Sequence, residues 1–379
     1  MTIKELAYSA QKHLQSRSGG SVKRAHVYEM LAAAFGFNSY AALTSDAVFT
    51  QRRLHAEAAT LDSPAIWQRC IELGYLPDIV DVISSRLPVF VAERKIDVIT
   101  LPDLAARLRS RSIFFTASSD WNEEDVQDET IGETWAGYHH GNVPPILLEG
   151  LEAAANNGSP VAHYALALIY VVEEDDHFRE EGSEYWYNQE QHGRVLIGVE
   201  KEWADVYAKQ LVEAEKHVYH LREAARLGYQ YALLELAERF NDPAFFERNG
   251  GAVVENPIRV SELANRLGRT DDAHHWLTVA AEAGDIDAMR QLIEGYDNDD
   301  LGLCWKWLYL AQLVGTDLAL SNYSLVNEDG SEYDEDVGGP GYPIGEEGVT
   351  LAALDAVQEA AARQSAHEAF KLISRRRAE

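Results

Sequence analysis

Small and large apolar residues follow one another in a fixed order at three places along the chain. Each copy has two adjacent Ala residues, a Gly three positions later, and then an Ala, a Leu and a Phe or Tyr spaced four apart. Residues four apart share one face of a helix, and Gly readily takes the left-handed conformation that ends a helix. The pattern therefore predicts a helix that ends at the Ala pair, a turn at the Gly and a second helix. The positions that carry it are Ala154, Gly158, Ala162 and Tyr170, then Ala224, Gly228, Ala232 and Phe240, then Ala280, Gly284, Ala288 and Tyr296.

A large ring stands four residues before the Ala pair in two of these copies, at His220 and Trp276. Trp307 has the same place before Ala311, with Gly315 following, and marks a degenerate fourth copy. One helical hairpin of this kind cannot bury its apolar face alone, so such hairpins stack on their neighbours. The sequence predicts an all-α fold, an irregular right-handed α-solenoid of helix-turn-helix repeats.

The repeated pattern resembles the Sel-like repeat, a relative of the tetratricopeptide repeat. The unit of that family ends in Trp-x-x-x-Ala-Ala-x-x-Gly and continues with Ala-x-x-x-Leu-Ala-x-x-Tyr. The resemblance covers about residues 149–320, and the uneven spacing of the Ala pairs predicts long insertions along one face or edge. It implies a non-catalytic scaffold or adaptor in a bacterial pathway, which binds a protein or peptide on the solenoid surface.

The remaining patterns predict how the chain is divided. Residues 22–46 contain His26, Met30, Ala32, Gly36-Phe37, Tyr40 and Leu43 at the spacing of a small bacterial helical module, which they resemble. The run from Pro88 to Ala92 fits either a short strand or a buried helix. We expect a basic helical module at 1–50, a helical segment at 51–148 that holds an acidic loop at 117–145, repeats at 149–323, an acidic Gly-rich loop at 324–349 and a C-terminal capping helix at 350–379.

Charge narrows the choice of partners. The chain has 379 residues and a net charge of −29, which opposes binding of nucleic acid by the body of the protein and favours a basic protein or peptide. The first 55 residues differ, with seven Lys or Arg against three Asp or Glu. Lys12, Arg17, Lys23 and Arg24 are the candidate phosphate contacts there. The alternative function is thus a nucleic-acid-associated regulator whose repeats recruit a partner, and a self-assembling structural component is a further alternative.

Aromatic residues give one candidate binding site. Tyr185, Trp186 and Tyr187 lie together in the insertion between the first two repeats, among acidic residues, where a loop is expected. Aromatic side chains often anchor protein interfaces. The same residues can also fold back on the solenoid, and the sequence leaves both interpretations open.

Signatures of catalysis are missing from the sequence. It contains no HExxH, CxxC, Gly-x-Ser-x-Gly, Walker-type or dinucleotide-binding pattern, so we expect neither an enzyme nor a bound cofactor or metal. His217 and His220 have the spacing for a shared metal on a helix, but His220 occupies a ring position of the repeat and is expected to pack. The stretch from Leu325 to Asp336 mimics part of a calcium loop with the wrong first and last residues, so a solvated loop is expected.

The two cysteines and the hydropathy of the chain predict the cellular compartment of the protein. Cys70 and Cys304 stand in apolar helical contexts, which predicts buried, reduced thiols. No apolar run approaches the length that spans a bilayer, and the first residues read as an amphipathic helix. We expect a soluble cytoplasmic protein without membrane contact.

Overall fold

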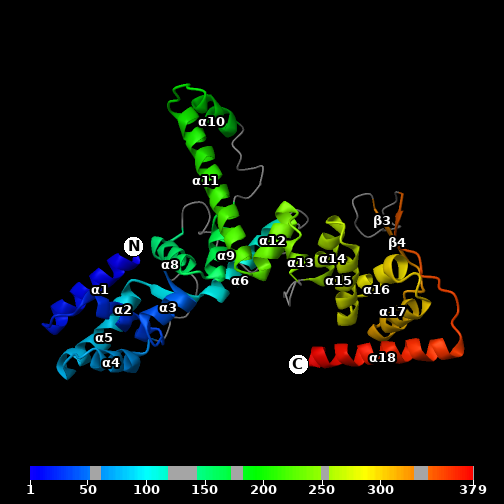
Figure 1. Ribbon diagram of the computed structural model, residues 1–379, viewed down its shortest axis with the longest axis horizontal. Helices are drawn as coiled ribbons and strands as arrows, with labels where there is room; N and C mark the ends of the chain where they lie inside the picture. Colours follow the sequence, from blue (N-terminus) through cyan, green and yellow to red (C-terminus); the bar gives the residue numbers. More distant parts are fainter. Residues whose placement is uncertain (52–60, 118–142, 172–181, 249–255, 328–339, 379) are drawn as a thin grey trace. The chain divides into compact units, whose positions relative to one another are not determined.

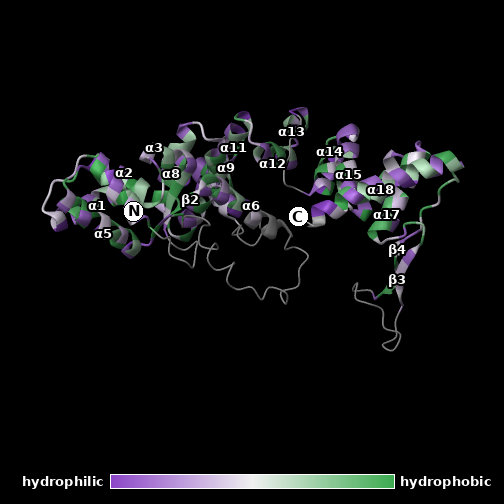
Figure 2. Cartoon of the chain, turned by 90° about the horizontal axis from the view of Figure 1, so that it is seen from below, coloured by the Kyte–Doolittle hydropathy of each residue, from purple (hydrophilic) through white to green (hydrophobic). Residues whose placement is uncertain are grey.

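Helices account for most of the chain in the computed structural model, which describes residues 1–51, 61–117, 143–171, 182–248, 256–327 and 340–378 (Figure 1). The all-α expectation is confirmed apart from two short sheets. Hydrophobic and hydrophilic residues, green and purple in Figure 2, occur together along single helices. The chain divides into two compact units, Met1–Leu236 and Ala237–Glu379. The sequence patterns did not indicate this boundary, which falls within a helix.

The first unit begins with helices that share one core. Leu6, Leu14 and Met30 are buried together with Ile66 and Ile83 from later helices. The predicted basic module therefore buries its apolar faces against residues beyond 50. Its helices are α1 (Ile3–Ser18), α2 (Arg24–Ala34) and α3 (Tyr40–Asp46), and they pack with α4 (Ser63–Glu72) and α5 (Pro77–Glu93).

A pair of strands joins this core to the repeats. β1 (Ala47–Gln51) and β2 (Ile96–Thr100) are antiparallel, with Ala47 opposite Thr100 and Gln51 opposite Ile96. No strand was predicted at either place. Of the two interpretations of Pro88–Ala92, the helix is correct, because these residues continue α5 and bury Phe90 and Val91.

The predicted helical pairs are present in the three clear copies of the repeat. They are α8 (Pro145–Asn156) with α9 (Pro160–Ile169), α11 (Val199–Arg226) with α12 (Gln230–Phe240), and α15 (Thr270–Ala283) with α16 (Ile286–Gln291). Gly158, Gly228 and Gly284 have φ of +86°, +88° and +99°, the left-handed turn that the pattern predicts. The residue after each Gly donates its N–H to the carbonyl of Ala154, Ala224 or Ala280, which closes the turn.

Packing at the repeat positions agrees only in part with the prediction. The Ala at positions 154, 162, 224, 232, 280 and 288 are all buried, as close helix contact requires. Phe240 was expected to fill the space between helices, but it is 44% exposed. The fourth copy stops at its turn: Gly315 has φ of +120°, and no helix follows it before β3. The solenoid stays a prediction.

The second unit contains α13 (Ala244–Glu247), α14 (Pro257–Arg266), α15, α16, the π-helix η3 (Leu292–Tyr296), α17 (Leu301–Val314) and α18 (Ala356–Ala378). The segment at 324–349, predicted to be a loop, instead contains β4 (Tyr342–Glu346) and the end of β3 (Asn322–Val326), which pair as antiparallel strands. The last helix starts at Ala356 and not at 350, so Leu351 and Leu354 precede it; they pack against the core from a segment without regular secondary structure. Ala362, Ala366 and Ile373 of α18 are buried in the core that Trp307 and Leu308 of α17 help to form.

Three further predictions concern the two cysteines, membrane-spanning helices and two acidic stretches of the chain. Cys70 and Cys304 are buried free thiols, as expected, and burial raises the pKa of Cys70 to about 12. Across the ranges given above, none of the helices has the length and apolar character needed to cross a membrane. Most of the acidic loop at 117–145 and of the calcium-like stretch at 325–336 lies outside the described residues.

Candidate protein-binding surface and histidine pair

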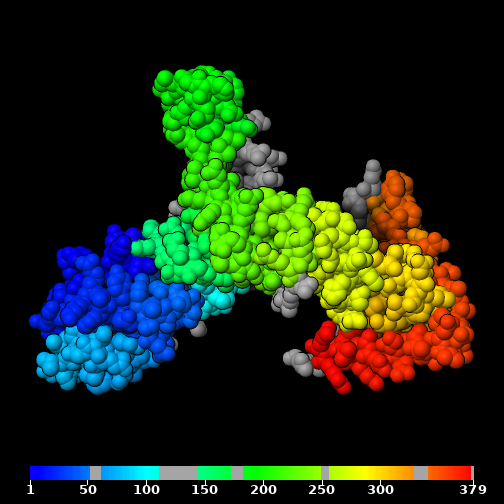
Figure 3. All heavy atoms as spheres, in the orientation of Figure 1, coloured from blue at the N-terminus to red at the C-terminus, as the bar shows by residue number. Residues whose placement is uncertain are grey.

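A long helical hairpin follows the first repeat. α10 (Ser183–Gln191) packs along the first half of α11, and together with the loop between them they form the α10–α11 hairpin, residues 183–213. Within the first unit, this hairpin stands out from the body to which the rest of α11 belongs (Figures 1 and 3). The Tyr187 and Tyr207 rings, with centroids 5.3 Å apart, join its two helices.

An apolar stripe on α11 extends beyond the half of the helix that packs against α9. In the second half of the helix, His217, Leu221 and Ala224 are buried where α11 packs against α9. Val206 lies eleven residues before His217, which is close to three helical turns, so it belongs to the same side of the helix. Val206 is nevertheless 48% exposed, and Val199, two turns earlier, is 55% exposed.

Other apolar residues of the hairpin are also in solvent. Val195 and Ile197 in its loop are 87% and 78% exposed, and Val212 on α11 is 50% exposed. Large exposed apolar patches are typical of interaction sites. The first half of α11 therefore presents more apolar surface than its contact with α10 covers.

The predicted aromatic cluster lies on this hairpin, but not in a loop. Tyr185, Trp186 and Tyr187 are part of α10. Tyr187 packs on Tyr207, and the Arg194 guanidinium lies 4.7 Å from the centroid of the Trp186 ring. Tyr185 is 53% exposed. Two of the three rings thus hold the hairpin together, and Tyr185 is the one available to a partner.

Each cation of the hairpin has a carboxylate neighbour, whereas two of its carboxylates have no ion pair among the described residues. Lys201 binds Glu190 at 2.6 Å and Asp205 at 2.7 Å, and Arg194 lies 3.6 Å from Glu200. Lys209 also has a carboxylate within 3.6 Å, that of Glu213. Glu184 and Glu202 have no ion pair within the parts of the chain that the structure describes. The surface beside the exposed valines is therefore negative.

The four predicted phosphate contacts are exposed, and two of them meet at one ring. The Lys12 ammonium lies 4.6 Å from the centroid of the Tyr8 ring, and the Arg24 guanidinium lies 5.5 Å from it. Tyr8 itself is 44% exposed. Arg17 lies in the last turn of α1 and Lys23 at the N-cap of α2.

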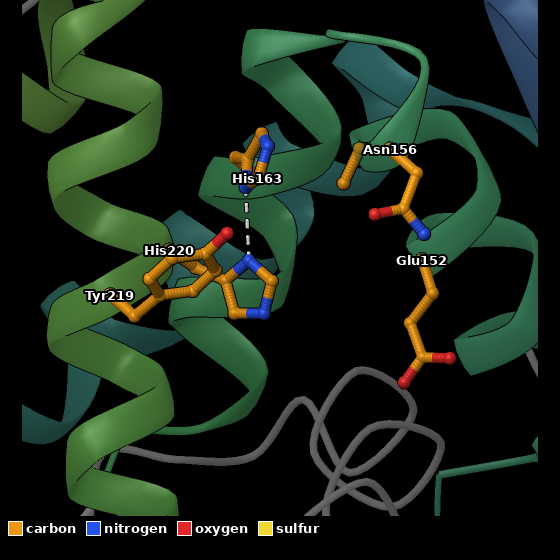
Figure 4. Close-up of a pocket in the computed structure, with 6 residues that line it drawn as sticks. Glu152, Asn156, His163, Tyr219 and His220 are labelled. Atoms are coloured by element: carbon orange, nitrogen blue, oxygen red, sulfur yellow. Dashed lines mark hydrogen bonds between the residues drawn. The ribbon is translucent and has the colours of Figure 1, made fainter.

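A shallow hollow of about 200 Å³ lies at the junction of α8, α9 and α11. Figure 4 shows His163 of α9 and His220 of α11 pointing toward each other, with Glu152 and Asn156 of α8 on the other side of the hollow. The Nδ1 atoms of the two histidines are 3.0 Å apart. Sequence reasoning missed His163, because no local pattern distinguishes it.

The structure separates the two histidines that the spacing had suggested as a pair. His217 places Nδ1 2.9 Å from the carbonyl oxygen of Ala167. His220 instead stacks on Tyr170, with ring centroids 6.0 Å apart and an interplanar angle of 16°. His220 therefore packs against a neighbouring ring, as expected, whereas its place in a repeat stays a prediction. Burial, with smaller contributions from His163 and Lys216, lowers the pKa of His220 to about 4, and burial likewise lowers the pKa of His163.

In the second unit, Asp297 connects Trp307, a predicted ring position of the repeat, to His274. Its Oδ2 accepts a hydrogen bond from Trp307 Nε1 at 2.7 Å, and its Oδ1 lies 2.9 Å from His274 Nε2. His274 stacks on Tyr296, with the ring planes 5° apart. Asp297 is only 6% exposed, so the carboxylate holds these side chains in place.

Comparison with family models, curated proteins and solved structures assigns no role to these groups. Over the described ranges, no cluster of three or more His, Cys, Asp or Glu side chains is arranged to hold a metal ion. No family model, curated protein or solved structure matches the chain.

Proposed function

We propose that this protein is a non-catalytic adaptor that binds a basic, amphipathic helix of a partner protein on the α10–α11 hairpin. The observation that carries the proposal is the apolar stripe of α11, which continues past the half that packs against α9 to Val206 and Val199, both about half exposed. The predicted repeats and their resemblance to an adaptor family support the same class of function.

The valines provide the apolar part of the binding energy. Covering the exposed half of one such side chain is worth about 1 kcal/mol, and Val195 and Ile197 in the loop of the hairpin add to Val199 and Val206. Residues on one face of a helix are matched by a partner that presents apolar residues at the same helical spacing. An amphipathic helix is therefore the partner that fits this face.

The charge of the hairpin determines whether the partner should be basic or acidic. The three cations of the hairpin already have carboxylate neighbours, whereas Glu184 and Glu202 have none among the described cations. Complementary charge mainly raises the association rate and rejects partners of the wrong sign. Lys or Arg residues beside the apolar face of the partner would neutralise these carboxylates, and added salt should weaken the complex.

A photo-crosslinking amino acid at position 206, compared with the same residue at position 357, identifies the partner in the native host. Val357 is a matched control because it is an exposed valine on another helix, α18. The affinity of the purified partner is then measured for Val206→Lys and Val357→Lys. We expect at least a tenfold loss for V206K and no change for V357K. Equal affinities for both variants, or a partner without a basic amphipathic helix, would contradict the proposal.

A second candidate function is nucleic-acid contact through residues 1–55. The observation that favours it is the exposed Tyr8 ring with Lys12 and Arg24 against it, since a ring flanked by cations can stack on a base and neutralise phosphate. Labelled single-stranded DNA or RNA should bind at low salt and lose affinity in Lys12→Glu with Arg24→Glu. No binding of wild-type protein at low salt removes this candidate.

A further inference from the structure

The paired strands β3 and β4 of the second unit expose large apolar side chains on both faces. Tyr323 and Leu325 of β3 are 59% and 47% exposed, and Tyr342 and Ile344 of β4 are 45% and 50% exposed. Because successive residues of a strand point to opposite faces, the register places the first two on one face and the last two on the other. Figure 2 shows both strands extending away from the helices of this unit.

The base of the strand pair is fixed to the second unit. The guanidinium of Arg290, whose side chain is 11% exposed, binds the Glu346 carboxylate at 2.6 Å and the Glu347 carbonyl oxygen at 2.9 Å. The N–H of Val349 donates to the carbonyl of Leu318 at 2.8 Å. A backbone that is already held in place costs a partner less ordering on binding.

The outer edge of β3 is open to a further strand. Leu325 lies opposite Pro343, which has no N–H, so this pair cannot exchange backbone hydrogen bonds. Hydrogen-bonded and non-bonded pairs alternate along an antiparallel ladder, so Tyr323 and Leu325 turn their N–H and C=O groups outward. Within the described residues, β4 is the only strand beside β3. β3 contains neither the Pro nor the Lys that commonly protects a sheet edge.

We propose that an extended segment of a partner protein, with alternating apolar and basic residues, adds to the outer edge of β3 as a third strand. Two strands alone are marginally stable in water, and a third strand with apolar side chains supplies the missing contacts. Tyr323 and Leu325 take the apolar residues of that segment on their face of the sheet. Strand addition is a known mode of peptide recognition, and it shares no residue with the α10–α11 hairpin.

Charge identifies the added segment as basic and argues against a second copy of this chain. The connection between the strands, residues 327–341, contains six Asp or Glu and no Lys or Arg. At the base of the strands, Arg290 already pairs with Glu294 and Glu346. A second copy would bring its own net charge of −29 to this edge, whereas Lys or Arg residues of a basic segment are attracted to it.

The test uses the full-length protein and a fluorescein-labelled peptide in which Val and Lys alternate over about ten residues. A peptide of the same composition, with all Val before all Lys, is the control for simple attraction to a negative protein. By fluorescence anisotropy, we expect the alternating peptide to bind saturably and at least tenfold more tightly than the control. Leu325→Lys should weaken its binding at least tenfold, whereas Leu320→Lys, at an exposed leucine outside the strands, should not.

Hydrogen exchange distinguishes strand addition from other modes of binding. The alternating peptide should slow exchange at the amides of Tyr323 and Leu325. A version of the peptide with N-methylated amides, which keeps the side chains but has no N–H donors, should lose its affinity. This version leaves the protein unchanged, so it decides the matter if circular dichroism shows that L325K does not fold.

Equal binding by L325K and L320K, or of the alternating and control peptides, would overturn the proposal. Binding that is lost in Val206→Lys and kept in L325K would place the peptide on the α10–α11 hairpin, which overturns this proposal and leaves the proposed function standing. A dimer in light scattering that L325K dissociates would show that a second copy occupies β3, and would overturn it as well.

Discussion

Replacement of Asp297 by Ala tests how the second unit is held together. The carboxylate accepts a hydrogen bond from the buried Trp307 indole at 2.7 Å and pairs with His274 at 2.9 Å. Hydrogen bonds to charged groups contribute about 1.5–3 kcal/mol, and a buried donor left without an acceptor costs about 1–3 kcal/mol. Trp307 is 1% exposed, so water cannot readily replace the carboxylate at the indole.

The loss at His274 should be smaller, because its side chain is 43% exposed and can be hydrated. Removal of a buried carboxylate also returns part of its desolvation cost. We therefore expect Asp297→Ala to lower the free energy of unfolding by about 3 kcal/mol. Asp297→Asn keeps an oxygen for the indole and should lose only about 1 kcal/mol.

Urea unfolding followed by circular dichroism gives the free energy, and hydrogen exchange in α17 assigns the loss to the second unit. Asp300→Ala is the matched control. Asp300 is exposed and caps α17 by accepting from Leu303 N at 3.1 Å, so its loss should cost about 1 kcal/mol. If D297A costs no more than D300A, the carboxylate does not anchor Trp307, and the reasoning from burial is wrong.

Three further outcomes follow from single residues. Gly228→Ala should lower the free energy of unfolding in urea by about 1–2 kcal/mol. The loss comes from the left-handed φ of +88° alone, because an added Cβ meets nothing within 4 Å. Gly295→Ala is the control, since it is also free of clashes but has no positive φ, and it should not destabilise the protein; equal effects of the two substitutions would contradict this. Because the pKa of His220 is depressed to about 4 in the folded protein, its contribution is complete above about pH 6.5 and is lost as pH falls toward 4. The melting temperature of wild-type protein should thus fall more steeply over that window than that of H220Q, and parallel curves would refute it. Arg290→Gln should speed hydrogen exchange in β3 and β4, because Arg290 binds the Glu346 carboxylate at 2.6 Å and the Glu347 carbonyl at 2.9 Å; unchanged exchange there would show that the hairpin does not depend on it.

Local signals explain what could be predicted of the fold. The turns at Gly158, Gly228 and Gly284 were identified because a left-handed residue between two helices almost requires Gly. The flanking Ala pairs were identified because close helix contact requires small side chains. Gly315 shows the limit of such signals, since its turn formed but the second helix did not.

Contacts between distant residues explain what was missed. The strand pair β1 and β2 depends on Ala47 meeting Thr100, and no short window of sequence contains both. The binding role of the aromatic residues 185–187 stays a prediction. Their acidic neighbours suggested a loop, whereas packing of Tyr187 on Tyr207 stabilises a helix.

The sequence by itself determined the helical hairpins and their turns, because spacing, small residues and Gly act within a few residues of one another. Only the tertiary structure placed His163 beside His220, Asp297 beside Trp307, and Val206 in solvent beyond the packed half of α11. Each of these depends on how one helix lies against another. The free energy of such packing comes from side chains far apart in the chain, which the local pattern of residues does not record.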